Sequence, residues 1–132
     1  GVIELLLDLK RDFRVSYLYI THDLAVARYI CDRIAVMYQG KIVEIGETEA
    51  MLSSPQHPYT QALIAAVPVP DPHYRRPEPA VKRTGKTAID PGPHCRFLER
   101  CPVATNRCQN EPHPPLMENH SGRMVACYET VG

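Results

Sequence analysis

The distribution of proline is the feature of this sequence that most constrains its fold. Of the thirteen prolines, four fall before residue 71 and nine fall after it. Proline lacks a backbone N–H and restricts the residue before it, so a proline-rich segment is a poor source of long helices or central strands. We therefore expect a packed α/β part followed by an extended, loop-rich part. The second part buries too little apolar surface to fold alone, so docking on a neighbour or a bound metal must organise it.

The part before residue 71 has the patterns of short helices and strands. The run 15–20 is apolar and rich in β-branched and aromatic residues, which predicts a buried strand. A helix over 24–31 and a strand over 33–38 follow, and this order implies a parallel pair of strands with a right-handed crossover. The other expected elements are a helix over 3–13, a turn at Gln39 and Gly40, a strand over 41–45 that completes a hairpin, and helices over 47–52 and 58–67.

Composition and charge narrow the classes of function. The formal net charge is zero, so the overall balance does not point to nucleic acid or to an anionic membrane surface. No apolar run approaches the roughly 20 residues that a membrane-spanning helix needs. The stretch 1–10 contains Glu4 and Asp8 and lacks a basic leader, which is not the pattern of a secretory signal. We expect any membrane association to come through a partner.

A histidine stands directly after the predicted strand over 15–20. His22 lies at the carboxyl end of that run, where α/β sheets place their ligands. An imidazole both donates and accepts hydrogen bonds near neutral pH, so it can contact a phosphate or orient a water. The alternative is that His22 only helps to cap the next helix, for which Asp23 and Thr21 are candidate N-caps.

Three stretches follow His22 in a fixed order: Ala25–Ala27, Cys31–Met37 and Gly40–Gly46. They resemble the helix, strand and hairpin that follow the switch histidine of the ABC ATPase family. The resemblance covers roughly residues 3–52. It implies that His22 contacts the γ-phosphate of ATP, and it implies an α/β fold: the C-terminal part of a P-loop NTPase (ABC ATPase) domain, followed by a loop-rich, cysteine-containing tail.

The stretch 57–63, with the sequence HPYTQAL, narrows the resemblance further. It is similar to the segment that marks the oligopeptide and dipeptide branch of ABC importers, whose members include nickel importers. We expect Pro58 to begin a docking helix that has no chemistry of its own. The chain is thereby identified as the C-terminal portion of an ATP-binding subunit. Its expected parts are 1–54 from the ATPase domain, 55–70 as the peptide-transporter-type helix and 71–132 as the proline-rich, cysteine-containing extension.

Four of the five cysteines crowd into the second part of the chain. An odd number of cysteines without an export signal argues against a disulfide scaffold. The resemblance implies that these four ligate a [4Fe–4S] cluster, with a structural role for the tail. Zinc, or thiols that are free or oxidised, are the alternatives. His94, His113 and His120 are close enough in sequence to replace a ligand. The four residues are Cys95, Cys101, Cys108 and Cys127. The fifth, Cys31, is expected to be a small buried hydrophobe.

The sequence lacks the motifs that bind nucleotide in this family. The stretch Thr84–Thr87 looks like the end of a phosphate-binding loop, but the glycine required five residues before Gly85 is replaced by Ala80. The magnesium-binding carboxylate strand and the Leu-Ser-Gly-Gly-Gln stretch are also missing. Phosphoryl transfer needs the phosphate cradle and the metal, so we expect no ATP hydrolysis by these 132 residues alone.

The resemblance implies a role for the full-length subunit. Two ATPase subunits would enclose ATP and Mg²⁺ on the cytoplasmic face of the membrane and drive transmembrane permease subunits that import peptides. We expect the fragment itself to self-associate. The alternatives are a stand-alone metal- or cluster-binding interaction module and a regulatory docking tail. Upstream sequence with a phosphate-binding loop would favour the first interpretation.

Overall fold

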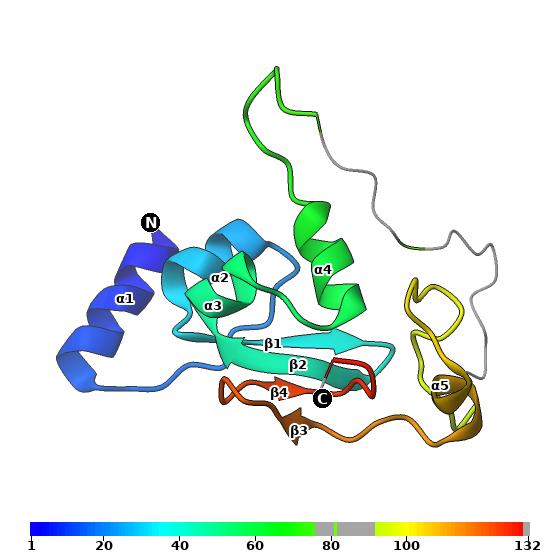
Figure 1. Ribbon diagram of the computed structural model, residues 1–132. Helices are drawn as coiled ribbons and strands as arrows, with labels where there is room; N and C mark the ends of the chain where they lie inside the picture. The colour runs from blue at the N-terminus through cyan, green and yellow to red at the C-terminus, as the bar shows by residue number, and fades with distance from the viewer. Residues whose placement is uncertain (76–80, 82–91, 131–132) are drawn as a thin grey trace.

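The computed structural model describes residues 1–75, 81 and 92–130, which form a mixed α/β structure (Figure 1). No helix in these ranges is long and apolar enough to cross a membrane. The elements, in chain order, are α1 (Val2–Phe13), α2 (Leu24–Ile30), β1 (Arg33–Tyr38), β2 (Lys41–Glu47), α3 (Thr48–Ser53), α4 (Pro58–Ala65), α5 (Asn106–Asn110), β3 (Met117–Glu118) and β4 (Met124–Val125).

The strands form one antiparallel sheet in the order β1-β2-β4-β3. The N-terminal part supplies the hairpin of β1 and β2, and the tail supplies β3 and β4. Val125 of β4 lies opposite Glu44 of β2, and the next residue, Ala126, donates its N–H to the carbonyl of Val43 at 2.8 Å. The described part of the proline-rich tail is therefore held by docking on the β1–β2 hairpin, which is one of the two means that the sequence suggested.

The hairpin confirms the turn expected at Gln39 and Gly40. Both residues have positive φ angles, 44° and 77°. Two successive residues of this kind are typical of a type I′ turn, whose twist matches that of the strands, and glycine reaches this conformation without steric cost. The helices expected in the first seventy residues are also present, with ends that differ by one or two residues from the sequence-based ranges.

The buried strand predicted over 15–20 is wrong. This segment is neither helix nor strand in the structure, and all of its residues are exposed. Leu18 is 92% exposed and Ile20 is 89% exposed. A strand needs a neighbour for its backbone N–H and carbonyl groups, and within the described chain β1 pairs only with β2. The parallel pair and its right-handed crossover are wrong for the same reason, since every pairing in the sheet is antiparallel.

The core joins the hairpin to the tail through aromatic side chains. One buried cluster contains Val36, Val43 and Met51, and a second contains Phe97 with three cysteines of the tail. Tyr38 packs against both clusters, and its ring centroid lies 5.2 Å from that of Phe97, edge to face. Phe97 is 1% exposed and thus anchors the tail on the hairpin.

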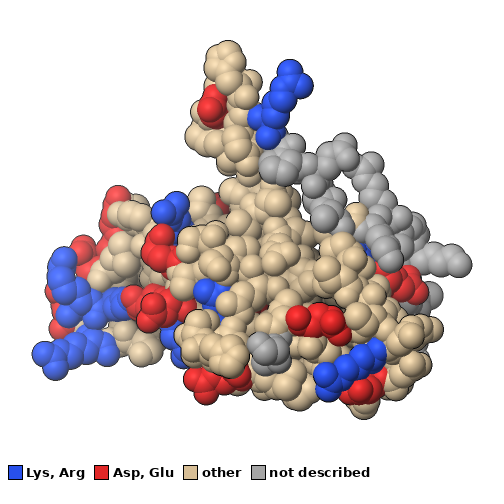
Figure 2. All heavy atoms as spheres, viewed as in Figure 1, with Lys and Arg blue, Asp and Glu red and all other residues tan. Residues whose placement is uncertain are grey.

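Helix α1 stands apart from this core. None of its residues is buried, and two of its charged side chains form ion pairs: Arg11 with Asp8 at 3.0 Å, and Lys10 with Asp32, which lies between α2 and β1. Figure 2 shows basic and acidic side chains interspersed at this end of the molecule, while the central face carries few charges. The phosphate-loop-like stretch Thr84–Thr87 lies outside the described residues.

Candidate functional site

The four cysteines of the tail come from three separate segments of chain. Cys95 and Cys101 flank a series of turns, in which Leu98 donates its N–H to the carbonyl of Cys95 at 3.1 Å and Cys101 donates to that of Leu98 at 3.3 Å. Cys108 lies on α5, and Cys127 follows β4. All four are buried, with between 5% and 8% of each residue exposed. The short turns and the docked strand thus bring together residues that the sequence spreads over more than thirty positions.

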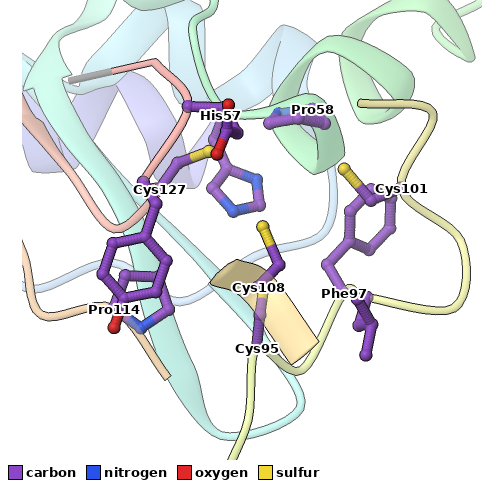
Figure 3. Close-up of a pocket in the computed structure, with 11 residues that line it drawn as sticks. His57, Pro58, Cys95, Phe97, Cys101, Cys108, Pro114 and Cys127 are labelled. Carbon is purple, nitrogen blue, oxygen red and sulfur yellow. The ribbon is translucent and has the colours of Figure 1, made fainter. Parts of the chain in front are cut away.

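These four cysteines line a single pocket (Figure 3). The backbone N–H of Cys95 also donates to the carbonyl of Cys108 at 3.4 Å, which ties the turn segment to α5. The structure has all five cysteines of the chain as thiols. The other residues that line the pocket are His57, Pro58, Phe97, Leu98, Pro114, Tyr128 and Glu129.

The electrostatics of the pocket follow from its apolar walls. Burial raises the pKa of the Cys95 thiol above its ordinary value, and negative charge on the other three cysteines raises it further, although a hydrogen bond from the backbone of Phe97 acts in the opposite direction. Deprotonation of several thiols here is therefore unfavourable unless a cation compensates the charge. A metal or an iron–sulfur cluster supplies such a charge, because its ligands are thiolates.

The placement of the thiols can be compared with what a bound metal ion requires. Among the described residues, no three or more His, Cys, Asp or Glu side chains are placed to hold one metal ion. A single zinc with Zn–S bonds of about 2.3 Å would require sulfur atoms roughly 3.8 Å apart. The four thiols line one pocket, but the described side chains are not placed as the ligands of one metal ion.

The histidines proposed as replacement ligands do not line this pocket. His120 is exposed, and His94 and His113 are partly buried. The Nδ1 atom of His113 accepts the N–H of Arg96 at 3.2 Å. Burial lowers the pKa of His113, with a further contribution from Lys41 and Arg96. The placement of His94, His113 and His120 therefore does not support the prediction that one of them replaces a cysteine ligand.

The histidine that does line the pocket is His57, which the sequence analysis treated as part of a docking helix without chemistry. It is 1% exposed and is the N-cap of α4, where its Nδ1 accepts the N–H of Tyr59 at 3.0 Å. Burial lowers its pKa to about 4, and the nearby His113 adds to this effect. In Figure 3 its ring lies between the sulfur of Cys127 and the side chain of Cys108. Its position directly before a proline that begins a helix was the one local signal for its capping role.

His22 lies elsewhere and is exposed. It has no hydrogen bond or ion pair with the part of the chain that the structure describes. The cap of α2 is Asp23, whose carboxylate accepts the N–H groups of Ala25 at 2.9 Å and Val26 at 3.2 Å. The prediction that Asp23 caps this helix is confirmed, so capping does not require His22. Its side chain is left accessible to a ligand.

Cys31 differs from the other cysteines. It was expected to be a buried hydrophobe, but it is only half-buried. It is the C-cap of α2, and its carbonyl accepts the hydroxyl of Thr48 at 2.6 Å. Its position at the end of α2, and not inside the helix, explains the partial exposure.

The chain is similar to known proteins of peptide transport. Residues 43–108 match the family model described as oligopeptide/dipeptide transporter, C-terminal region. The chain is 44% identical over 127 residues to a probable peptide ABC transporter ATP-binding protein of Sinorhizobium fredii, covering 96% of this chain and 36% of the relative. It is 42% identical over 130 residues to the dipeptide transport ATP-binding protein DppF of Haemophilus influenzae, covering 96% of this chain and 38% of the relative.

A third relative is the di/tripeptide transport ATP-binding protein DppF of Pseudomonas aeruginosa. It is 38% identical over 128 residues, which cover 96% of this chain and 39% of that protein. The chain thus spans less than two fifths of the length of these relatives. The matched family region runs from β2 to α5 and includes His57 and three of the four pocket cysteines.

Proposed function

This chain belongs to the oligopeptide/dipeptide transporter C-terminal region family, and from this premise we propose that it forms the C-terminal part of the ATP-binding subunit of a peptide-importing ABC transporter. The observation that carries the proposal is the match over 96% of the chain to ATP-binding proteins of peptide transporters. The mixed α/β structure is consistent with that origin. The chain's own role is to complete the subunit and not to hydrolyse ATP alone.

In the complete subunit, His22 would contact the γ-phosphate of ATP and help to hold the attacking water. Its exposure supports this role, because a side chain used in capping or packing would not be accessible to nucleotide. Asp23, which caps α2 through two backbone N–H groups, would fix the position of the preceding residue. ATP and Mg²⁺ would be bound by other parts of the subunit.

The tail would carry a [4Fe–4S] cluster on Cys95, Cys101, Cys108 and Cys127. The support is the burial of all four thiols around one pocket that has apolar walls. The cluster would supply the positive charge that stabilises four buried thiolates and would hold the turn segment, α5 and the end of β4 together. A structural role follows, because the described part of the tail contributes four strand residues to the sheet.

The partners of the complete subunit would be a second ATPase subunit and transmembrane permease subunits, at the cytoplasmic face of the membrane. The exposed segment 15–20 and the exposed apolar side chains of α1 support a packing role for this end of the chain. In the isolated chain the same surface would instead drive self-association.

A chimera tests the proposal directly. Residues 1–132 would replace the matching stretch of the H. influenzae dipeptide transport protein DppF in a strain that lacks the native copy. Restored dipeptide uptake is the expected result, and the same chimera with His22→Ala would be the inactive control. A chimera that is produced at normal levels but gives no uptake would contradict the proposal.

A stand-alone thiolate-metal module is the second candidate. The observation that favours it is that the thiol pocket forms entirely within this chain. The two candidates differ in their requirement for the rest of the subunit. A module of this kind would bind metal when produced as residues 1–132 alone. It would contribute nothing to peptide uptake in the chimera. A regulatory docking tail would support uptake at a changed rate.

A further inference from the structure

Helix α2 follows His22 directly and is attached to the core at few points. Asp23 is its N-cap, and His22 is the residue before that cap. Ala27 is the one buried residue of this helix, with 5% of its surface exposed. The position of His22 therefore depends on how the opposite end of α2 is held.

Thr48 holds that opposite end through two hydrogen bonds. Its backbone N–H donates to the carbonyl of Asp32 at 3.0 Å, and its hydroxyl donates to the carbonyl of Cys31 at 2.6 Å. Cys31 is the C-cap of α2, and its own N–H donates to the carbonyl of Ala27 at 2.9 Å. Carbonyls at the end of a helix have no partner within the helix, so an outside donor such as Thr48 fixes them.

Thr48 is itself fixed to the core. It is the first residue of α3 and is 4% exposed. Met51 of the same helix is 1% exposed and belongs to the buried cluster of the hairpin, and Arg123 of the tail donates to the carbonyl of Ala50 at 2.9 Å. Figure 1 shows α2 and α3 side by side over the hairpin. Helix α3 thus connects the core to the helix that follows His22.

We propose that Thr48 is a positioning residue for ATP hydrolysis: its hydroxyl holds the C-terminal end of α2 and so fixes His22 at the γ-phosphate and the attacking water. The inference rests on the proposed function of His22 and adds the residue that orients it. Thr48 does not touch nucleotide, because its side chain is buried and engaged with Cys31. A small displacement of a catalytic group slows the chemical step more than it weakens substrate binding, so the loss belongs in kcat.

Two substitutions of Thr48 separate its hydroxyl from the rest of the side chain. Thr48→Val keeps the shape and removes the hydroxyl, whereas Thr48→Ser keeps the hydroxyl and removes a methyl group. Thr60→Val is the matched control, since Thr60 is 1% exposed and its hydroxyl has no hydrogen-bond partner within the described part of the chain. Thr48→Ala also lacks the hydroxyl and takes the place of Thr48→Val if that variant does not fold.

The variants would be made in the chimeric DppF subunit, alone and together with His22→Ala, and steady-state ATPase activity and equilibrium nucleotide binding would be measured. We expect Thr48→Val to lower kcat about tenfold and to leave ATP affinity nearly unchanged. Thr48→Ser should recover most of the loss, and Thr60→Val should match the unsubstituted chimera. In the His22→Ala background Thr48→Val should cause no further loss of kcat, because a residue that acts through His22 then has nothing to position.

A measurement without nucleotide tests the attachment of α2 itself. Backbone amide hydrogen exchange of the 132-residue chain, followed by NMR, reports how often α2 opens. The N–H groups of Ala27 and Cys31 form the hydrogen bonds that begin and end this helix. We expect Thr48→Val to raise their exchange rates about tenfold, as the loss of one buried hydrogen bond would. Thr60→Val should leave these rates unchanged.

The outcomes separate the role of Thr48 from that of His22. Turnover in His22→Ala close to that of the unsubstituted chimera would overturn the proposed function of His22 and the role of Thr48 with it. A loss in His22→Ala together with normal turnover in Thr48→Val, or equal losses from Thr48→Val in the two backgrounds, would overturn the role of Thr48 alone. Unchanged exchange rates in Thr48→Val would show that the hydroxyl does not hold α2, which would also overturn the role of Thr48.

Discussion

Arg123 Nη1 donates to the carboxylate of Glu44 at 3.2 Å, and both side chains are almost completely buried, with 7% and 0% of their side-chain surface exposed. The two residues lie 79 positions apart in the sequence. Glu44 also accepts the backbone N–H groups of Gln56 and His57, and Arg123 donates to the carbonyls of Ala50 and Ser54. This ion pair therefore joins the tail to β2, α3 and the segment that begins α4.

We predict that Arg123→Met lowers the free energy of unfolding by about 3 kcal/mol or more. Removing one partner of a buried pair leaves the other charge without compensation. Here the substitution also leaves two carbonyl acceptors without their donor. Urea unfolding of the chain, followed by circular dichroism, would measure the loss.

The exposed pair of Arg28 and Glu49 provides the matched control. These residues are joined by a bond of 3.1 Å but are 64% and 71% exposed. Arg28→Met should cost less than about 1 kcal/mol, because water and salt screen an exposed pair. Equal losses of unfolding free energy at the two sites would show that burial does not strengthen the contribution of the Glu44–Arg123 pair. The double variant Glu44→Gln with Arg123→Met should lose less than the sum of the two single changes.

Sequence reasoning was accurate where the signal is local. The hairpin followed from Gln39 and Gly40 between two short apolar runs, and the cap of α2 followed from Asp23. In each case the residues that determine the structure are neighbours in the chain, so their chemistry is visible without knowledge of the fold.

Sequence reasoning failed where the structure depends on distant partners. The composition of 15–20 suits burial, but a strand also needs a neighbour, and none of the described strands pairs with it. Strands β3 and β4 have two residues each within a proline-rich tail, so no periodicity could indicate them. The four pocket cysteines were identified as a group, whereas His57 was not, because its ring orientation depends on the N–H of Tyr59 and on the fold of the tail.

We predict that each of the four pocket cysteines is required for iron and for order in the tail. Cys95→Ser, Cys101→Ser, Cys108→Ser or Cys127→Ser should bleach the broad absorbance near about 400 nm that iron–sulfur clusters give. Each change should also speed proteolysis within 92–130. Cys31→Ser should do neither, since Cys31 caps α2 and does not line the pocket. Anaerobic protein that has no iron but keeps a protease-resistant tail would contradict the prediction.

We predict that the 132-residue chain does not bind Mg-ATP tightly and does not hydrolyse it. His22 alone cannot cradle phosphates or hold magnesium. Isothermal titration of the chain with Mg-ATP should give no heat of binding in the micromolar range. Micromolar affinity would contradict the prediction.

In a complete ATP-binding subunit that contains this segment, we predict that His22→Ala leaves ATP affinity nearly unchanged and lowers kcat by a factor of about one hundred or more. A contact to the γ-phosphate and the attacking water gains most of its strength in the transition state, so its loss appears in kcat. Steady-state ATPase assays and equilibrium nucleotide binding on the same preparation separate the two effects. Turnover close to wild type would assign His22 no role in hydrolysis.

Self-association of the isolated chain follows from the exposed segment after α1. Leu18 and Ile20 are 92% and 89% exposed, and full burial of such a side chain contributes roughly 1.5–3 kcal/mol. We predict that the sedimentation coefficient of the chain rises with concentration, and that the double variant Leu18→Glu with Ile20→Glu remains monomeric.

Val103→Glu, which changes a half-exposed valine of the tail, is the control and should associate like wild type. The substituted residues have no part in the sheet or the core. The free energy of unfolding in urea should therefore be the same for the double variant and for Val103→Glu. A wild-type chain that sediments as a monomer at every concentration would show that two copies do not bury this segment against each other.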